Sequence, residues 1–260
     1  TLHGRIRPAA AKNSVLPLLA ATLLCRTPSR LRAVPPLADV ATSLALLQSV
    51  GAKAERQGSD LFVAPGQDLQ GEIPDYLAGA MRSSVFYLAP LLCRVGEVRL
   101  PLPGGCKLGP RPVDIHLAGL AAMGAQVELE GIAVTLRRRG PLHGVDFALR
   151  LPSVGATMTL MMAATQAGGT TILRGAHITG AGTPVVVIQG GKPLQGTAWT
   201  PLPDRIAAAT YAAALACAGG EVTVTHCAPA YYAAFLDFLQ AAGVDVARQD
   251  TTVTLARSPA

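Results

Sequence analysis

One loop of the sequence places a thiol among glycines and cations. Cys106 follows Gly104 and Gly105, precedes Lys107, and lies five residues before Arg111. Because nearby cations lower the pKa of a thiol, this setting favours the nucleophilic thiolate. The alternative is an inert loop cysteine, and the spacing alone leaves both interpretations open. The other four cysteines lie among apolar residues at the ends of expected helices or strands, which predicts core packing for them.

Two expected helix starts offer places for an anion. Arg111 is followed by a proline, a valine and Asp114, and a proline in the first turn is typical of a helix start whose free N–H groups favour anions. Ser153 is a good N-cap for a second apolar segment, and Gly155 would let a phosphate approach the backbone. An ordinary capped helix also explains each segment, and for Ser153 simple capping is the better explanation when the segment is taken alone.

Two cations and one histidine complete the set of candidate residues. Lys12, followed by Asn13, precedes one apolar helix, and Arg82 lies in another. A charged side chain beside a buried helix is unfavourable unless it binds a ligand or reaches solvent at the edge of the core. His116 is the one histidine near the Cys106 loop, and we predict a structural role for it. The histidines and cysteines show no metal-binding spacing, so neither a metal nor a cofactor is expected.

The chain repeats one structural unit. Each copy has an apolar helix, a short strand, a second helix with the pattern Leu-x-x-Leu, a glycine four residues after the second leucine, and two closing strands. In the complete copies the first helix covers residues 18–25, 88–93 or 212–217, and the glycine is Gly51, Gly124 or Gly243. A glycine there suits the left-handed residue that ends many helices.

Two copies depart from the common spacing. The end of the first helix and the glycine are 26 positions apart in copies one and four (25 to 51 and 217 to 243), but 31 apart in copy two. The five extra residues fall in 101–111, and an insertion rich in glycine and proline predicts a functional loop. In copy three the interval is 7 positions (168 to 175), so 19 positions and the second helix are missing near residues 176–177. Either they are deleted, or the numbering closes over residues that were not observed.

The apolar pattern predicts the layering of the fold. The first helices are apolar nearly all round, which is typical of buried helices, and the strands alternate apolar and polar residues, which is typical of half-buried strands. We therefore predict an α/β fold with the helices buried and the sheets outside. This is the inverse of the usual order of layers.

The composition limits the possible partners. The 260 residues are 50% hydrophobic and 15% charged, which predicts a globular chain with a sizeable core. The net charge of +6 favours anionic partners, whereas only 4% aromatic residues argues against nucleic acid. The longest apolar run, residues 15–25, is too short for a membrane span, so no membrane partner is expected. The first residues do not have the pattern expected of a signal peptide, and five widely spaced cysteines predict free thiols and a cytoplasmic protein.

Taken in order, these residues resemble one family. The matching segments are Ala11-Lys12-Asn13, Met81-Arg82-Ser83-Ser84, Leu102-Pro103-Gly104-Gly105-Cys106, Arg111-Pro112-Val113-Asp114, Ser153-Val154-Gly155-Ala156-Thr157 and Pro203-Asp204-Arg205-Ile206. Over essentially all its residues the chain resembles the UDP-N-acetylglucosamine 1-carboxyvinyltransferases of the enolpyruvyl transferase family. The cysteine loop followed by Arg-Pro-Val-Asp is the most specific motif, because the related shikimate-pathway enzymes lack that loop.

The resemblance implies a reaction and its residues. The enolpyruvyl (carboxyvinyl) group of phosphoenolpyruvate would move to the 3-hydroxyl of UDP-N-acetylglucosamine with release of phosphate, the first committed step of peptidoglycan precursor synthesis. By resemblance, Cys106 attacks or protonates the enol and is alkylated by fosfomycin, and the catalytic cations Lys12, Arg82 and Arg111 surround phosphoenolpyruvate. The implied ligands of the sugar nucleotide are Asn13, Arg111, Pro112, Val113, Asp114, Ile115, Ser153, Val154 and Gly155.

The resemblance also implies two inside-out, barrel-like α/β domains built from βαβαββ units. The first is expected at residues 12–203, with a third unit that lacks a helix, and the second at 1–11 and 204–260, with one unit instead of the usual three. Three interpretations follow: part of a complete transferase, a shortened non-catalytic relative that binds UDP-sugars, or a repeat-built structural protein. The third is the weakest, because it leaves six ordered motifs unexplained.

Overall fold

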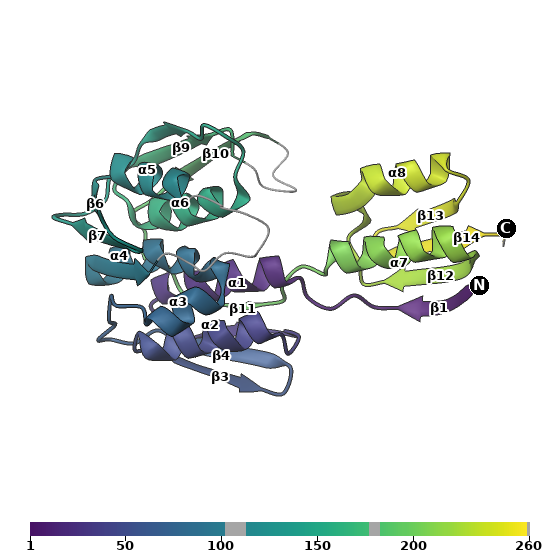
Figure 1. Cartoon of the computed structure of the whole chain (residues 1–260), viewed down its shortest axis with the longest axis horizontal. Helices are drawn as coiled ribbons and strands as arrows, with labels where there is room; N and C mark the ends of the chain where they lie inside the picture. The colour runs from purple at the N-terminus through teal and green to yellow at the C-terminus, as the bar shows by residue number, and fades with distance from the viewer. Residues whose placement is uncertain (102–112, 177–182, 259–260) are drawn as a thin grey trace. The chain divides into compact units, whose positions relative to one another are not determined.

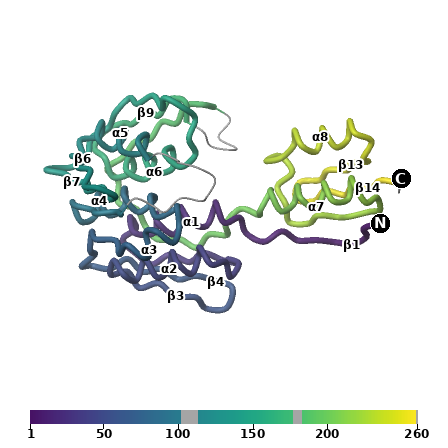
Figure 2. Tube along the Cα trace, viewed as in Figure 1, coloured from purple at the N-terminus to yellow at the C-terminus, as the bar shows by residue number. Residues whose placement is uncertain are grey.

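The structure, a computed structural model, describes residues 1–101, 113–176 and 183–258 (Figure 1). The chain forms two compact units. Unit 1 comprises Thr1–Ser14, Ala33–Pro35 and Thr200–Ala260, and unit 2 comprises Val15–Arg32 and Pro36–Trp199. The backbone trace in Figure 2 passes from unit 1 into unit 2 within the first helix and returns to unit 1 after Trp199.

Unit 2 contains three copies of the repeated unit. The first has α1 (Lys12–Ala21), η1 (Thr22–Leu24), β2 (Ser29–Leu31), α2 (Ala38–Ser49), β3 (Lys53–Gln57) and β4 (Asp60–Ala64). The second has α3 (Asp75–Ala80), η2 (Arg82–Tyr87), α4 (Leu88–Val95), β5 (Glu97–Pro101), α5 (Asp114–Ala122), β6 (Ala125–Glu130) and β7 (Ala133–Arg138). The third has β8 (Asp146–Ala148), α6 (Val154–Gln166), β9 (Thr170–Arg174) and β10 (Val185–Gln189), and β11 (Ala198–Trp199) follows it.

Unit 1 contains the fourth copy. Its elements are β1 (Leu2–Ile6), α7 (Arg205–Ala218), β12 (Gly220–Thr225), η3 (Pro229–Tyr232), α8 (Ala233–Ala241), β13 (Asp245–Gln249) and β14 (Thr252–Arg257). The two segments that connect unit 1 to the rest of the chain are hydrogen-bonded to each other. The N–H of Ala11 donates to the carbonyl of Leu202, and the N–H of Asp204 donates to the carbonyl of Ala9, both at 2.8 Å.

The four sheets follow one pairing rule. Their strand orders are β11-β2-β4-β3, β5-β7-β6, β10-β9-β8 and β1-β12-β14-β13. In each copy the strand that follows the first helix, which is β2, β5, β9 or β12, pairs antiparallel with the last strand of that copy. On its other side this strand pairs parallel with a further strand, β11, β8 or β1, which in copy two is reduced to a bridge between Glu72 and Arg99. The repeat read from the sequence is therefore a repeat of strand pairing.

The third copy has a three-stranded sheet, β10-β9-β8, that is built differently from the others. Its last strand, β10, pairs antiparallel with β9 in the place that β4, β7 and β14 take in the other sheets. The described residues contain neither a second helix between β9 and β10 nor a counterpart of β3, β6 and β13. The prediction that a helix is missing near residues 176–177 concerns residues 177–182, which lie outside the described part of the chain.

The helices of unit 2 lie inside its sheets, which confirms the predicted α/β layering. Figure 1 shows the sheets on the outside of this unit with the helices between them. In α4 the five consecutive residues from Leu88 to Leu92 are all buried, as expected for a helix surrounded by protein. Strands such as β4 and β9 alternate instead and bury every second side chain, whereas the central strand β7 buries Ala133 to Leu136 in a row. Each sheet thus has one face on the helices and one face in water.

Two buried polar pairs connect successive copies in unit 2. The hydroxyl of Ser43 on α2 lies 2.5 Å from that of Tyr87 at the end of η2, and Nδ1 of His116 on α5 lies 2.9 Å from the hydroxyl of Thr159 on α6. Ser43 and His116 occupy the same position of the repeat, one residue before its Leu-x-x-Leu pattern. A buried polar group without a partner costs stability, so these pairs fix how each copy packs on the next.

The glycines that follow the second helices have the predicted conformation. Gly51, Gly124 and Gly243 have φ angles of 94°, 102° and 85°, which residues with a side chain rarely adopt. The prediction for the cysteines was wrong at one position. Cys227 is buried, and Cys25 and Cys93 are half-buried, but Cys217 is exposed, because the face of α7 that carries it is not covered by other described residues. In the part of the chain that the structure describes, no helix combines the length and apolar character needed to cross a membrane.

Candidate functional site

The start of α6 is built as the sequence predicts. Ser153 is the N-cap, and its side-chain oxygen accepts a hydrogen bond of 3.2 Å from the N–H of Ala156. The hydroxyl of Thr157 donates to the carbonyl of Ser153 at 2.7 Å and holds the capping residue in place. Val154, which opens the helix, is 41% exposed. The positive end of a 13-residue helix therefore faces an accessible surface, as an anion site requires.

The start of α5 is tied to the segment before α6. Asp114, the first residue of α5, is exposed, and its carboxylate accepts two hydrogen bonds from the guanidinium of Arg150, one of them at 3.0 Å. Val113 before it is half-buried, and Ile115 after it is buried in the core. Because Arg150 lies three residues before Ser153, this ion pair holds the two helix starts together. Arg150 was not among the residues singled out from the sequence.

His116 lies between these two helix starts. It is 6% exposed, and Thr159 on α6 is its hydrogen-bond partner. Gly155 gives the imidazole room, because a Cβ atom at Gly155 would lie 3.3 Å from Cε1 and Nε2 of His116. The pKa of His116 is lowered to about 4, mainly by burial and also by the positive charge of Arg82, while the negative charge of Asp114 opposes the shift. The imidazole is therefore neutral at pH 7. One of its ring nitrogens can donate a hydrogen bond and the other can accept one.

Arg82 belongs to the same cluster. It opens η2 directly before the buried helix α4, and its side chain is partly buried. Its charge acts on His116, which places it beside the starts of α5 and α6. The structure therefore brings together five predicted positions from two copies of unit 2, namely Arg82, Asp114, Ser153, Val154 and Gly155.

Lys12 and Asn13 are the first residues of α1. Both are exposed, and both belong to unit 1, whereas the helix continues in unit 2 from Val15. The carbonyl of Ala11 before them accepts the N–H of Ser14 at 2.9 Å, which makes the first turn of the helix. The remaining predicted residues, Cys106, Arg111 and Pro112, lie outside the described residues.

His116 and Thr159 show what the sequence interpretation missed. The predicted structural role of His116 is consistent with its burial and its hydrogen bond, but its contact with Gly155 also places it at the candidate site. A signal was present in the sequence, because a polar residue precedes the Leu-x-x-Leu pattern in copies one and two. Thr159, a polar residue within an apolar helix, was the corresponding signal on the partner side.

The cluster suits an anionic ligand that also offers polar groups. One helix start, the guanidinium of Arg82 and a neutral imidazole supply positive potential and hydrogen-bond groups without a second buried charge. Among the residues described by the structure, no group of three histidine, cysteine, aspartate or glutamate side chains is arranged to hold a metal ion.

Solved structures identify the class of fold. The enolpyruvyl transferase NikO from Streptomyces tendae superposes with a TM-score of 0.83 at 22% sequence identity, over 98% of this chain and 66% of that chain. EPSP synthase from Acinetobacter baumannii gives a TM-score of 0.77 at 16% identity, over 98% of this chain and 64% of that one. At such low identity these likenesses define the fold alone, which is that of the enolpyruvyl transferases.

Sequence comparison then identifies the family. The model of the EPSP synthase (3-phosphoshikimate 1-carboxyvinyltransferase) family matches residues 1–259, and the chain belongs to this family. A UDP-N-acetylglucosamine 1-carboxyvinyltransferase from Cellvibrio japonicus (strain Ueda107) is 39% identical over 273 aligned residues, which cover 98% of this chain and 65% of the relative. The enzyme of the same name from Photorhabdus laumondii is 40% identical, over 95% of this chain and 62% of the relative. The chain thus spans less than two thirds of the length of these relatives.

Proposed function

We propose that the chain acts in the transfer of the enolpyruvyl group of phosphoenolpyruvate to the 3-hydroxyl of UDP-N-acetylglucosamine, with release of phosphate. The observation that carries the proposal is the identity of 39–40% to enzymes named for this reaction, over nearly the whole of this chain. The Cys106 loop, with Arg111 after it, supports the same assignment within the family, because this loop distinguishes the UDP-N-acetylglucosamine enzymes from their shikimate-pathway relatives.

In this proposal the sugar nucleotide binds at the starts of α5 and α6. The backbone from Ser153 to Gly155 takes the diphosphate, since it combines a helix N-terminus with a glycine that lets an oxygen approach closely. The segment from Arg111 to Ile115 contacts the uridine, and Asn13 orients the sugar. The ion pair between Asp114 and Arg150 keeps the two segments in register before the ligand arrives.

Phosphoenolpyruvate carries a carboxylate and a phosphate, so it needs several cations. We assign this role to Lys12, Arg82 and Arg111, because guanidinium groups match both anions in a two-pronged geometry. The 3-hydroxyl oxygen of the sugar adds to C2 of the enol and its proton passes to water, while C3 takes a proton, for which the Cys106 thiol is the candidate donor. The resulting tetrahedral ketal loses phosphate from C2 and a proton from C3, which restores the vinyl group. The cations stabilise the charge that develops on the departing phosphate.

The domain assignment is part of the same proposal. We assign residues 12–203 to one domain with three units, and residues 1–11 and 204–260 to a second domain with one unit. The three copies around the buried helices of unit 2 support the first assignment. The alignment with the Cellvibrio japonicus relative is longer than this chain, so that relative carries residues without a counterpart here. A cytoplasmic location follows from the proposed substrates, which are metabolites of the cytoplasm.

Phosphate release tests the reaction. The chain is incubated with phosphoenolpyruvate and UDP-N-acetylglucosamine, each alone and both together, and inorganic phosphate is measured. We expect release only with both substrates, and a fall of about 10²–10⁴-fold in Cys106→Ser, the range of a lost proton donor. Cys217→Ser is the matched control, because it removes an exposed thiol that is not among the candidate site residues. Release that persists unchanged in Cys106→Ser contradicts the role of this thiol.

A second outcome favours the alternative function. The chain spans 62–65% of the length of its relatives, so a non-catalytic UDP-sugar-binding protein is the second candidate. That candidate predicts saturable binding of UDP-N-acetylglucosamine in calorimetry together with no release of phosphate. Absence of both binding and turnover would contradict both functions.

A further inference from the structure

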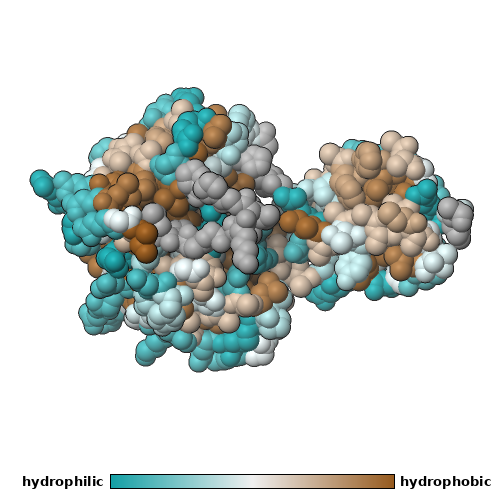
Figure 3. All heavy atoms as spheres, in the orientation of Figure 1, coloured by the Kyte–Doolittle hydropathy of each residue, from teal (hydrophilic) through white to brown (hydrophobic). Residues whose placement is uncertain are grey.

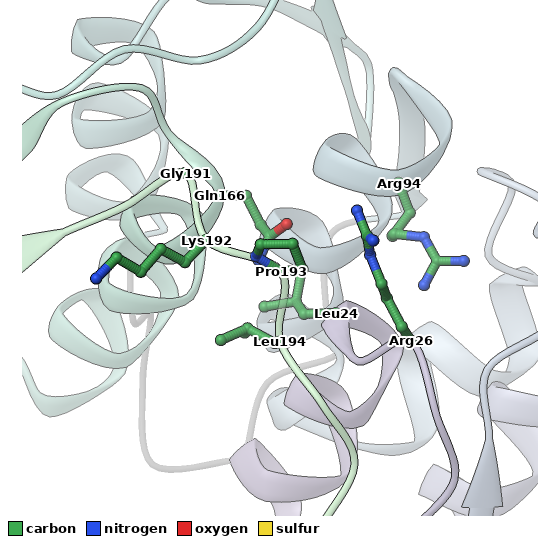
Figure 4. Close-up of a pocket in the computed structure, with 8 residues that line it drawn as sticks. All are labelled: Leu24, Arg26, Arg94, Gln166, Gly191, Lys192, Pro193 and Leu194. Carbon is green, nitrogen blue, oxygen red and sulfur yellow. The ribbon is translucent and has the colours of Figure 1, made fainter.

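A pocket of about 380 Å³ lies where the buried helices of unit 2 end (Figure 4). Its wall includes Leu24 at the end of η1, Arg94 in the last turn of α4 and Gln166 at the end of α6. The segment from Gly191 to Leu194, which leads toward β11, forms another part of the wall, and the pocket is open to solvent. All of these residues belong to unit 2, so the pocket is a property of this unit alone.

This pocket is distinct from the candidate site at the helix starts. Ser153 caps the first turn of α6, whereas Gln166 is the last residue of the same helix. With a rise of about 1.5 Å per residue, a 13-residue helix separates the two ends by about 20 Å. Arg82 likewise precedes α4, whereas Arg94 ends it. No substrate role proposed above reaches this end of the helices.

The pocket is lined by cations and by no carboxylate. Arg26, Arg94 and Lys192 contribute three positive charges, and the described residues include no acidic partner within ion-pair distance of any of them. Other arginines of unit 2 do have such partners. The paired ones are Arg30, Arg99, Arg137, Arg150 and Arg174. The pocket therefore gathers three cations that no described carboxylate neutralises.

Arg94 is held in place by neutral acceptors. Its guanidinium donates to the carbonyl of Leu23 at 2.6 Å, to that of Cys25 at 3.3 Å and to that of Gly66 at 3.2 Å. Carbonyls at the end of a helix carry only a partial negative charge, so they orient the guanidinium without cancelling its full charge. Half-buried and fixed, Arg94 is a preorganised cation.

Arg26 is placed next to Arg94 by the backbone. Its N–H donates to the carbonyl of Leu194 at 2.8 Å, which fixes the residue at the edge of the pocket. Figure 4 shows its side chain extending toward that of Arg94, while Lys192 points the other way from an exposed part of the chain. Two like charges that share one pocket repel each other, and an anion between them would convert this repulsion into attraction.

We propose that this pocket binds a small organic anion with at least two negative charges, either a phosphate ester or a polycarboxylate. Arg26 and Arg94 hold one anionic group, and Lys192 adds attraction at the rim. The volume is at the small end of the range for ligand pockets, so the ligand is a compact metabolite. Leu24, Pro193 and Leu194 offer apolar contact to its carbon chain. Bound there, the anion links the segment after β10 to the ends of α1 and α4.

Amide NMR of the ¹⁵N-labelled chain tests the proposal, with pyrophosphate and citrate as separate probes. We expect saturable shifts of the Gln166 and Gly191 amides with at least one probe, and binding at least tenfold weaker in Arg26→Gln/Lys192→Gln. The control is Lys53→Gln/Arg139→Gln, which removes the same charges from exposed positions elsewhere in unit 2. Arg94 is left intact, because it also holds the backbone.

The distribution of the shifts decides the outcome. Saturation by pyrophosphate alone assigns the pocket to phosphorylated ligands, and saturation by citrate alone assigns it to polycarboxylates. In Arg82→Gln the shifts at Gln166 and Gly191 should remain, because Arg82 lies at the other end of the helices. No saturable shift at these amides with either probe, or equal binding by the variant and its control, would overturn the proposal. Shifts confined to the residues around Ser153 would overturn it too.

Discussion

The first helices of the copies in unit 2 and the first helix of unit 1 have similar sequences but different environments. Counting back six residues from positions 25, 93, 168 and 217 gives Leu19, Tyr87, Met162 and Tyr211. The first three are 0%, 1% and 7% exposed, whereas Tyr211 is 48% exposed. The same position of the repeat is therefore core in one unit and surface in the other.

Packing between copies explains the difference. In unit 2, α4 packs against α6 and η1, so each first helix is surrounded by helices of the other copies. In unit 1, α7 buries only Ala208, Ala212 and Leu215, which face its own sheet and α8. Figure 3 shows apolar residues on the face of unit 1 that is in view. Phe238 on α8 is 66% exposed and Tyr211 on α7 is 48% exposed. An apolar helix in a repeat is thus buried by its neighbouring copies and not by its own sheet alone.

The largest expected difference is between the two tyrosines. Tyr87→Ala removes a buried ring and leaves Ser43 without its partner, so we expect a loss of about 3–5 kcal/mol in the free energy of unfolding. Tyr211→Ala at the equivalent exposed position should cost less than about 1 kcal/mol. Urea unfolding followed by circular dichroism measures both. Equal losses of stability would contradict the claim that Tyr87 is buried and Tyr211 is exposed.

The next effect is a change in the free energy of unfolding with pH, which arises from the buried pair of His116 and Thr159 between copies two and three. The pKa of His116 is about 4 when folded and 6.5 when exposed, so the unfolded chain binds more protons between these values. The free energy of unfolding should therefore fall by about 3 kcal/mol as the pH drops from 6.5 to 4. His116→Gln should flatten this part of the profile, and His143→Gln, at an exposed position, should leave it unchanged. An unaltered profile in His116→Gln would contradict the burial of a neutral imidazole.

The third prediction compares the thiol reactivity of Cys93 on α4 with that of Cys217 on α7, which lie near the ends of equivalent helices. Burial raises the pKa of Cys93 to about 12, against the opposing charge of Arg138, whereas Cys217 is exposed. Because the thiolate is the reactive form, N-ethylmaleimide should label Cys217 on the order of 100-fold faster than Cys93. A short pulse of reagent followed by peptide mass mapping gives both rates. Similar rates would mean that α4 is no better covered than α7.

The smallest effect compares two helix-ending glycines. Gly51 and Gly243 both have a positive φ, so replacement of either by alanine should cost about 1 kcal/mol. A Cβ atom at Gly51 would also lie 3.0 Å from the carbonyl oxygen of Asp68, whereas at Gly243 it would meet no described atom within 4 Å. Thermal unfolding should therefore show Gly51→Ala to be the more destabilising of the two. The reverse order would contradict the tighter packing of unit 2.

Local periodicity was enough to predict the repeat, the buried helices and the glycines that end them. Spacing alone could not predict that Arg82, Asp114 and Gly155 lie together, because that requires the packing of α4, α5 and α6. It also failed for Cys217, since the burial of an apolar helix depends on neighbouring copies that a single helix does not encode. The polar pairs of Ser43 and His116 were visible only as polar residues at one position of the repeat.

Titration with UDP-N-acetylglucosamine tests the central claim, that the helix starts of unit 2 bind a sugar nucleotide. We predict saturable binding by the 260-residue chain in calorimetry, with shifts of the Ser153 and Gly155 amides in NMR spectra. Gly155→Val should weaken this binding, because its side chain would occupy the approach to the backbone and crowd His116. No binding at millimolar ligand, or binding that leaves these amides unshifted, would contradict the claim.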